Sequence, residues 1–323
     1  MTNKKKTAIL FAYNGAKFNG SQIQNAHENV RTVEAELQSA LFKARCISSE
    51  NYGFLNKVKW TRASRTDKGV HALCAVVGLK MEWETKPYEE ILSEINSYLP
   101  DDVRLISLKL VANQFNAKNS SSFREYQYLF PSNVFSSDNL EEMIERFNFI
   151  AKYFHGTHSF HNYSKDIMPD KPEAKRYIVK FEVENKVVEY SGCSYLKFVI
   201  TGQSFLYHQI RKMIGMTICV YLGRFRCEDI VKSFENDPFY VPLAPAEGLS
   251  LNRVHFTVYN KKQGHRPVVV NEDEEKLVQG FYEGSILPTV HASWQTFKDW
   301  AVAEAEERVV ATETQVTSLL TCE

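Results

Sequence analysis

Hydrophobic and polar positions follow two different periods along the chain, which predicts a mixture of strands and helices. A period of two predicts strands, bounded by turn residues, over residues 9–13, 73–81, 103–111, 123–131, 177–184, 194–201 and 249–259. Apolar residues at helical spacing predict helices over 32–44, 87–98, 138–154 and 207–222, with a short segment at 227–235. Thr32 is a candidate N-cap, and Asp138-x-x-Glu141 has the pattern of a capping box.

Strand pairs that are interleaved with helices favour the α+β class, with two sheet-containing halves and helices packed on one face. We expect the boundary between the halves near residue 112, so that residues 1–112 and 113–260 form the core. Residues 261–323 have a weaker periodicity and are predicted to be an acidic C-terminal extension. A cleft where the two halves meet is the natural place for a substrate.

Composition limits the class of protein and its cellular location. The chain has 323 residues, of which 44% are hydrophobic, enough for a full core. It contains neither an apolar stretch long enough to span a membrane nor a signal peptide, so we expect no membrane partner and no secretion. Six scattered cysteines without a C-x-x-C pair indicate reduced thiols. We expect a nuclear location, with the cytoplasm as the alternative. The run Lys4-Lys5-Lys6 is too short to settle the compartment.

The formal net charge of zero hides an uneven distribution. Residues 271–323 hold eleven acidic and three basic residues, a net charge of −8, which leaves +8 on the remainder of the chain. A basic body is what binding to RNA phosphates requires, although a solvated surface would show the same bias.

The segment WTRASRTDKGVHA, which begins at Trp60, places Arg62, Arg65 and Lys68 around the single carboxylate of Asp67. Gly69 follows and can adopt a turn conformation that other residues avoid. Neighbouring cations favour the ionised form of an aspartate, which suits a nucleophile or an electrostatic catalyst better than a general acid. The alternative is a loop aspartate in a structural ion pair.

Three histidines, His155, His158 and His161, have the spacing H-x-x-H-x-x-H. Positions six apart do not share a helix face well, and Gly156 and Ser159 favour a loop. No cysteine or carboxylate cluster completes a metal site nearby, so we predict packing or RNA contact and no metal.

The sequence RTDKGVHA resembles the motif around the invariant aspartate of the TruA-type tRNA pseudouridine synthases. Further matching segments follow the family order: FAYNGAKFNGSQIQ from Phe11, FREYQYLF from Phe123, FLYHQIRKMIG from Phe205 and APAEGLSLNRVHF from Ala244. GTHSFHNYSKD from Gly156 is similar to the eukaryotic multisite branch, which acts in and around the anticodon stem and on a spliceosomal RNA. Ser21 departs from the usual opening motif. The resemblance implies two ferredoxin-like halves around a central RNA-binding cleft.

The resemblance also implies roles for individual residues. Asp67 is the expected catalytic carboxylate, with Arg65 holding the displaced nucleotide and Arg211 pairing with the aspartate. Tyr126 is expected to stack on the target uracil, although Tyr128 points to the same side of its strand. Lys68, His71 and Arg124, from the same motifs, are expected to contact the RNA.

The implied reaction cleaves the bond between ribose C1′ and uracil N1 and rejoins the base through C5. Asp67 would either attack the sugar or take its C2′ proton, and the sequence leaves both routes open. The reaction needs no redox change and no cofactor, in keeping with the lack of a P-loop or a dinucleotide motif. The expected partner is tRNA, with other structured RNA as a further candidate, bound by a monomer or a homodimer. The rival functions are a catalytically silent RNA-binding protein on the same scaffold and a metal-dependent RNA hydrolase.

Overall fold

The computed structural model describes residues 4–24, 30–82, 86–135, 139–165 and 167–319, with side chains up to residue 306. It divides into two compact units. Unit 1 comprises Met1–Tyr126 and Ser250–Thr289, and unit 2 comprises Gln127–Leu249 and Val290–Glu323. Each unit contains both strands and helices, which confirms the predicted α+β class. The boundary expected near residue 112 falls inside unit 1, and residues 261–323 are shared between the units.

The sheet of unit 1 has the strand order β4-β1-β3-β10, with β2 also paired to β3. Strand β1 pairs antiparallel with β3 and β4, whereas β10 pairs parallel with β3. The sheet is therefore mixed. Its strands are β1 (Lys4–Tyr13), β2 (Thr61–Arg62), β3 (His71–Glu82), β4 (Val103–Leu110), β10 (Leu249–His255) and the first half of β5 (Phe123–Pro131).

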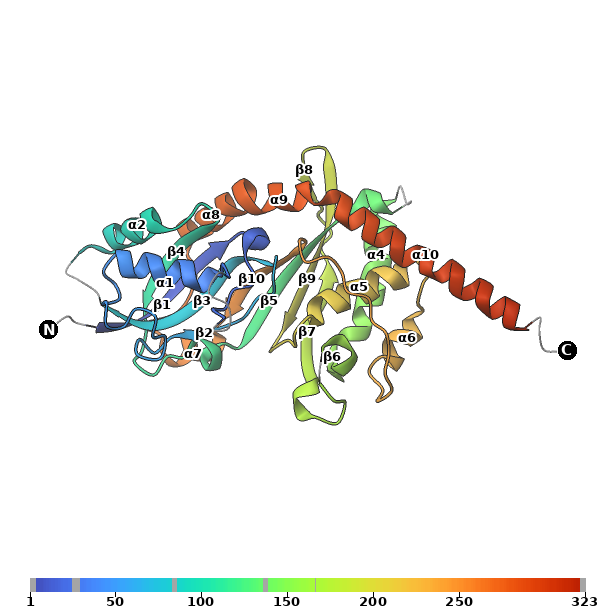
Figure 1. Cartoon of the computed structure of the whole chain (residues 1–323), viewed down its shortest axis with the longest axis horizontal. Helices are drawn as coiled ribbons and strands as arrows, with labels where there is room; N and C mark the ends of the chain where they lie inside the picture. Colours follow the sequence, from blue (N-terminus) through green and yellow to red (C-terminus); the bar gives the residue numbers. More distant parts are fainter. Residues whose placement is uncertain (1–3, 25–29, 83–85, 136–138, 166, 320–323) are drawn as a thin grey trace. The chain divides into compact units, whose positions relative to one another are not determined.

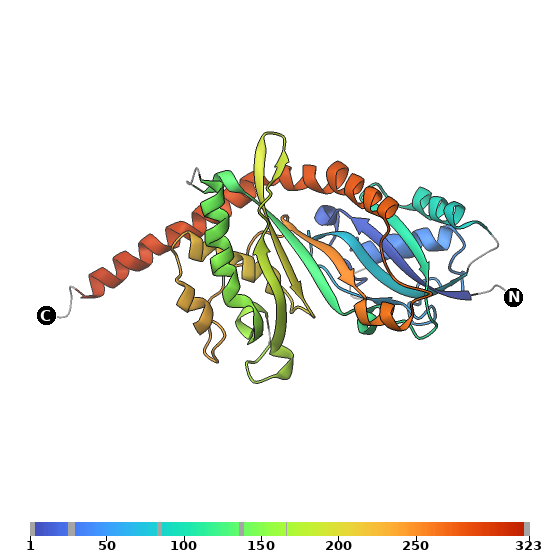
Figure 2. The ribbon, with the colours of Figure 1, turned by 180° about the vertical axis from the view of Figure 1, so that it is seen from behind.

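Helices α1 (Val33–Lys43) and α2 (Tyr88–Tyr98) cover one face of this sheet (Figures 1 and 2). Helix α1 begins after Thr32, as predicted, and acidic side chains at 34 and 36 favour the positive end of its dipole. Unit 1 also contains the 3₁₀ turn η1 (Gly15–Lys17) and the short helices α3 (Ala117–Ser120) and α7 (Thr257–Lys262). Residues 257–259, expected to continue a strand, thus lie in the helix α7.

Unit 2 continues β5 into the strand order β5-β9-β7-β6, and β8 pairs with β9. Its strands β6 (Gly156–Ser159), β7 (Lys175–Val183), β8 (Val188–Tyr190) and β9 (Cys193–Gly202) are joined by antiparallel pairings. Helix α4 (Leu140–Ala151) runs along β7 (Figure 2) and packs against α5 (Gln209–Tyr221), with α6 (Cys227–Lys232) nearby. The 3₁₀ turns are η2 (Ser132–Val134), η3 (Lys152–Phe154), η4 (His161–Tyr163) and η5 (Pro172–Ala174).

Two local predictions in unit 2 differ from the structure. Asn139 caps α4, accepting a hydrogen bond from the Glu142 amide, whereas Asp138 of the predicted capping box lies outside the described residues. Residues 156–159 form strand β6 rather than the expected loop, because pairing with β7 supplies backbone hydrogen bonds that no local pattern reveals.

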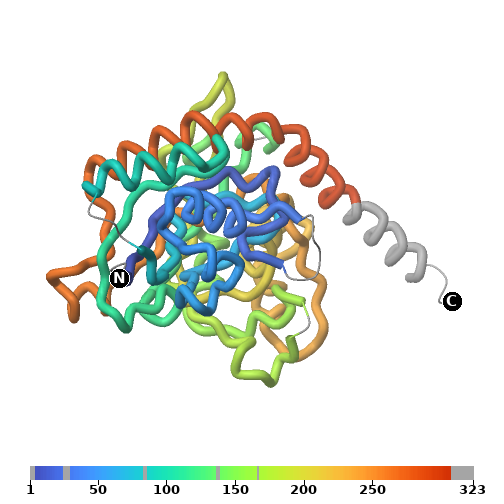
Figure 3. The backbone as a smooth tube through the Cα atoms, turned by 60° about the vertical axis from the view of Figure 1, so that its left-hand side comes forward, coloured from blue at the N-terminus to red at the C-terminus, as the bar shows by residue number. Residues whose placement is uncertain are grey.

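The acidic C-terminal region is structured. It forms α8 (Glu272–Phe281), the π-helical turn η6 (Tyr282–Ile286), α9 (Leu287–Ala292) and α10 (Trp294–Leu319). Helix α8 lies beside α2 and β4 within unit 1 (Figures 1 and 3). The buried carboxylate of Glu274 accepts hydrogen bonds from Ser107 and Lys109, each at 2.6 Å, and also caps its own helix at Asn271. Helix α8 of the predicted extension is therefore packed within unit 1.

Candidate active site

The turn between β2 and β3 presents Asp67. Arg65 and Lys68 on either side are exposed, Thr66 is buried and Asp67 is half-buried. Gly69 has φ +81°, a conformation that glycine adopts without steric cost, and the Val70 amide donates to the Asp67 carbonyl at 3.2 Å. The sequence RTDKG therefore folds into a tight turn with the carboxylate near its apex.

Thr66 fixes this turn to the opening segment of the chain. The Tyr13 hydroxyl lies 2.7 Å from Thr66 Oγ1, at a buried position. Ser21 makes two further bonds, because its Oγ accepts from the Thr66 amide at 3.0 Å and its own amide donates to the Thr66 carbonyl at 3.2 Å. The residue before Asp67 is thus held through its side chain, its amide and its carbonyl.

Two glycines of the opening motif allow this close approach. A Cβ at Gly15 would lie 2.0 Å from the Val70 carbonyl oxygen, so only glycine fits. Gly20 has φ +94° and faces Thr66, whose carbonyl oxygen would be 3.2 Å from an added Cβ. The segments that contain residues 15–21 and 66–70 therefore pack backbone against backbone.

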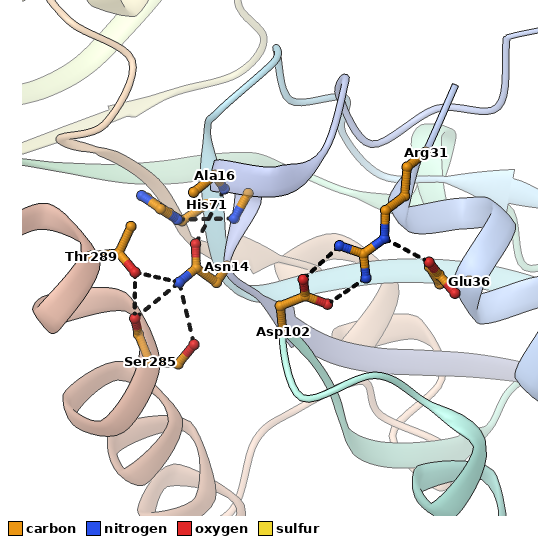
Figure 4. Close-up of polar contacts among 9 residues, drawn as sticks. Asn14, Ala16, Arg31, Glu36, His71, Asp102, Ser285 and Thr289 are labelled. Carbon is orange, nitrogen blue, oxygen red and sulfur yellow. Dashed lines mark hydrogen bonds and ion pairs between the residues drawn. The ribbon is translucent and has the colours of Figure 1, made fainter. Parts of the chain in front are cut away.

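His71 lies within this packing and is fully buried. The Gly15 amide donates to its Nδ1 at 3.0 Å (Figure 4), so Nδ1 is the unprotonated nitrogen. A side chain at this position is shielded from a polyanion in solution. The structure thus gives His71 a supporting role, and the direct RNA contact inferred for it gains no support.

Arg62 does not add its charge to the Asp67 turn as expected. Its guanidinium forms a two-point ion pair with Glu34, with Nε–Oε1 at 2.5 Å and Nη2–Oε2 at 3.0 Å. Glu34 is only 3% exposed and also accepts hydrogen bonds from the Trp60 indole and the Ile23 amide. A buried carboxylate with four donors ties α1 to the chain that enters the turn.

Tyr126 lies in the part of β5 that belongs to unit 1, where its ring is buried. Burial, with a contribution from the negative charge of Asp67, raises the pKa of Tyr126 to about 12, so the phenol stays neutral. Tyr126 and Asp67 belong to the same unit. The stacking of Tyr126 on uracil stays a prediction.

The neighbouring positions on β5 have different surroundings. Tyr128 lies in unit 2, is fully buried and donates to the Pro245 carbonyl at 2.9 Å, which accounts for it as a core residue. The guanidinium of Arg124 donates to the Ala63 carbonyl, with Nη2 at 2.7 Å, and burial lowers its pKa. Arg124 therefore holds the start of the Asp67 turn, whatever contact it makes with RNA.

Arg211 lies in the first turn of α5 in unit 2 and is half-buried. Its Nε donates to the Ala244 carbonyl at 2.7 Å, and the Ala244 amide donates back to the Arg211 carbonyl. This bond orients the guanidinium, whose two Nη groups have the geometry that a carboxylate or phosphate accepts. Because Asp67 belongs to unit 1, the pairing of these two residues stays a prediction.

His208, at the start of α5, has φ +65°, a left-handed conformation that is uncommon for residues other than glycine. Burial, together with the charges of Arg211, Lys212 and Lys165, lowers the pKa of His208 to about 4. The imidazole is therefore neutral at physiological pH, at a strained position directly before the helix that carries Arg211.

Each histidine of the H-x-x-H-x-x-H pattern has its own structural partner. His155 accepts from the Phe181 amide, His158 stacks on Phe234 with ring centroids 4.3 Å apart, and His161 is hydrogen-bonded to Ser159. Within the described ranges, no group of three metal-ligating side chains is close enough to hold an ion.

Over the same part of the chain, no helix is long and apolar enough to cross a membrane.

The sequence reasoning missed Tyr13, Ser21 and Glu34 as supports of the Asp67 turn. Tyr13 and Ser21 belong to the opening motif FAYNGAKFNGSQIQ, and this membership was the one available signal. Their partners lie more than 40 residues away along the chain.

Comparison with known proteins defines the class to which this site belongs. A family profile described as tRNA pseudouridine synthase matches residues 150–257, which include α5 and Arg211. The Asp67 turn lies outside that match. Its motif and the matched region together indicate a pseudouridine synthase.

Relatives cover most of the chain. A mouse protein named pseudouridylate synthase 1 homolog is 36% identical over 302 residues, or 89% of this chain and 70% of its own length. The human protein of the same name is 35% identical over 87% of this chain and 68% of its own. The chain therefore belongs to the TruA-type tRNA pseudouridine synthase family, in its eukaryotic pseudouridylate synthase 1 branch. A Saccharomyces cerevisiae protein named tRNA pseudouridine(27/28) synthase is 26% identical over 79% of this chain and 85% of its own length.

Proposed function

We propose that this protein isomerises uridine to pseudouridine in tRNA, with Asp67 as the catalytic carboxylate. The observation that carries the proposal is the anchored turn of the RTDKGVHA motif, in which Tyr13 and Ser21 hold the residue before Asp67. Catalysis requires a reacting group held in one geometry, because small misplacements raise the barrier steeply.

The chemistry follows from the groups around Asp67. An ionised carboxylate can attack ribose C1′ or remove the C2′ proton while the bond from C1′ to uracil N1 breaks. The freed uracil turns and bonds to C1′ through C5. As this bond forms, the Asp67–C1′ bond of the attack route breaks, or in the other route the proton returns to C2′. The C5 proton then leaves to solvent and N1 takes up one proton, so the product is an isomer of the substrate. In this proposal Tyr126, which lies in the same unit as Asp67, is expected to offer its ring to the base, and Arg211, whose guanidinium is oriented by Ala244, is expected to serve as charge partner of the carboxylate.

We propose a uridine in the anticodon stem as the target, because the yeast relative is named for positions 27 and 28. A stem hides its bases, so the enzyme has to extrude the nucleotide before reaction. Arg65 and Lys68 are exposed on either side of Asp67, where they can neutralise phosphates next to the extruded base. This arrangement favours catalysis on RNA over the silent RNA-binding alternative, since simple phosphate binding does not require the anchoring of Thr66.

The test uses tRNA transcripts that carry tritium at C5 of uridine, in the presence of a chelator. We expect wild-type protein to release tritium and Asp67→Asn to release none while it still binds tRNA. Asp101→Asn, a change at an exposed turn residue before β4, serves as the matched control and should retain wild-type activity. Cleaved RNA strands, or tRNA binding by the wild type without tritium release, would overturn the proposal in favour of a hydrolase or a silent binding protein.

A further inference from the structure

Residues 272–289, the C-terminal segment, contact Asn14, the residue that directly follows β1 and precedes the glycine packed against the Asp67 turn. Asn14 Nδ2 lies 2.6 Å from Thr289 Oγ1, 3.0 Å from the Ser285 carbonyl oxygen and 3.4 Å from Ser285 Oγ (Figure 4). Thr289 Oγ1 in turn donates to the Ser285 carbonyl at 2.9 Å. One amide from β1 and two residues 271 and 275 positions later therefore form a closed polar cluster.

The π-helical turn at Tyr282–Ile286 contributes to this contact. A π-helical turn widens the helix and commonly marks a functional position. In this turn Ser285 directs its carbonyl toward Asn14, while Ile286 on the neighbouring position is fully buried and Tyr282 nearly so. The turn thus fixes the C-terminal segment in the core of unit 1 and offers a backbone acceptor to β1.

The same Asn14 side chain also organises the chain that leads to the Asp67 turn. Its Oδ1 accepts from the Ala16 amide at 3.2 Å and so caps the 3₁₀ turn η1. Between them, the Gly15 amide donates to His71, and the Gly15 Cα is packed on the Val70 carbonyl. Val70 closes the turn by donating to the Asp67 carbonyl. An unbroken series of short contacts therefore links Thr289 to Asp67 through Asn14, Gly15 and Val70.

We propose that Asn14, Ser285 and Thr289 are positioning residues for Asp67, so that the C-terminal segment holds the catalytic turn in place. This inference rests on the proposed function and extends it, because it assigns the C-terminal region a part in catalysis. The segment is well suited to this task. Glu274 fixes α8 to β4, and Glu275 pairs with Arg253 of β10 at 2.7 Å, so that the segment is rigid before it reaches Asn14.

The experiment removes the Thr289 end of the contact and leaves the cap on η1 intact. Thr289→Val keeps the shape of the side chain and removes its hydroxyl, and Thr289→Ser restores it. We expect Thr289→Val to lower kcat for tritium release about three- to tenfold, the effect of losing one hydrogen bond of ordinary strength. The Kd for tRNA should change less than about twofold, because phosphate contacts dominate affinity. Thr289→Ser should recover most of the wild-type kcat.

A double-mutant cycle distinguishes positioning from a general loss of stability. If the contact acts through Asn14, Thr289→Val should cause no further loss of kcat in an Asn14→Ala background. The control Gln279→Ala removes an exposed hydrogen bond from α8 to Glu283 of η6 and should leave kcat unchanged. Multiplicative losses in the double variant, or equal losses of kcat and tRNA affinity in Thr289→Val, would overturn the proposal.

Hydrogen–deuterium exchange supplies a readout that is independent of activity. In Thr289→Val we expect faster exchange of the amides of residues 14–18 and 66–71, with no change at β6, which belongs to unit 2. Unchanged exchange in both segments would refute the positioning role even if the protein proved to have a different activity. Failure of the proposed function would instead appear as absent tritium release by the wild type, with the exchange difference still present.

Discussion

Thr66→Val tests how far the anchoring of the catalytic turn controls the reaction. Valine keeps the branched shape of threonine but lacks Oγ1, which lies 2.7 Å from the Tyr13 hydroxyl. Loss of one buried hydrogen bond costs about 1–3 kcal/mol. If this cost appears in the activation barrier, kcat falls about five- to 150-fold. Because both hydrogen bonds from the Thr66 backbone to Ser21 remain, we expect the lower part of this range, about five- to twentyfold.

The turn itself should survive this substitution, since the Thr66 amide still donates to Ser21 Oγ and the Thr66 carbonyl still accepts from the Ser21 amide. The assay measures kcat by tritium release at saturating tRNA, together with the Kd for tRNA, which we expect to change less than about twofold. Thr66→Ser keeps the hydroxyl and serves as the matched control. Tyr13→Phe removes the same bond from the other side and should lower kcat to a similar extent.

The combination of Tyr13→Phe with Thr66→Val decides whether this bond is the cause. Once one partner is gone, removal of the other should add little, so the double variant should resemble either single variant. The reasoning is refuted if the two losses multiply, or if Thr66→Val unfolds at a lower temperature while its kcat equals that of the wild type.

Three further predictions follow from the site. Tyr126→Ala should lower kcat by at least about tenfold, while tRNA affinity falls far less. The kcat of Tyr126→Phe, which keeps the ring, should stay within a few-fold of wild type. Equal losses of turnover and binding in Tyr126→Ala would contradict a stacking role. Arg211→Lys should lower kcat about tenfold or more at nearly constant Kd, because lysine cannot bind a carboxylate at two points; a full-activity Arg211→Lys variant would exclude the predicted pairing with Asp67. His208 has a folded pKa of about 4, below the usual 6.5, so the unfolded chain takes up a proton first and wild-type stability should decrease as the pH is lowered from about 6.5 to 4. Asparagine tolerates φ +65° and does not titrate, so the melting temperature of His208→Asn should fall less over this pH range. Identical pH profiles of the wild type and this variant would show that His208 is not the group responsible.

The regular elements of the fold were predictable because their patterns are local. Alternating residues located β5 at its observed bounds, and helical spacing located α1 and α2 within a residue or two. Strands β6 and β8 were missed, because strands of four and three residues are too short to show a period and depend on pairing with β7 and β9. Periodicity works where one element buries its own stripe of side chains.

The C-terminal region shows what local patterns do not reveal. Its acidic residues and weaker periodicity predicted an acidic extension and gave no sign that Glu274 is only 8% exposed, with its burial compensated by Ser107 and Lys109. The partner of a buried charge is set by tertiary structure, and the sequence contains no local trace of it. Arg62 is a second case: proximity in sequence placed it with Asp67, whereas its ion pair is with Glu34, 28 residues earlier.

The candidate site was predictable where motif residues act together in one turn. Asp67, Arg65 and Lys68 occupy the turn as expected, and Tyr126 belongs to the same unit. The residues that hold the turn were not predictable in the same way, because Tyr13, Ser21 and Asn14 reach it from another strand end. These residue types are common in proteins, and only the tertiary structure shows that they hold the Asp67 turn.

The backbone contact between Gly15 and Val70 has a consequence for any exchange of parts between relatives of this protein. A Cβ at residue 15 would overlap the carbonyl oxygen of residue 70, so each segment fixes the path of the other. A chimera that receives only residues 63–71 from a relative therefore contains a turn whose backbone fits the relative's opening segment and not its own. The smallest transferable module consists of two pieces, residues 13–21 and 63–71, which have to be moved together.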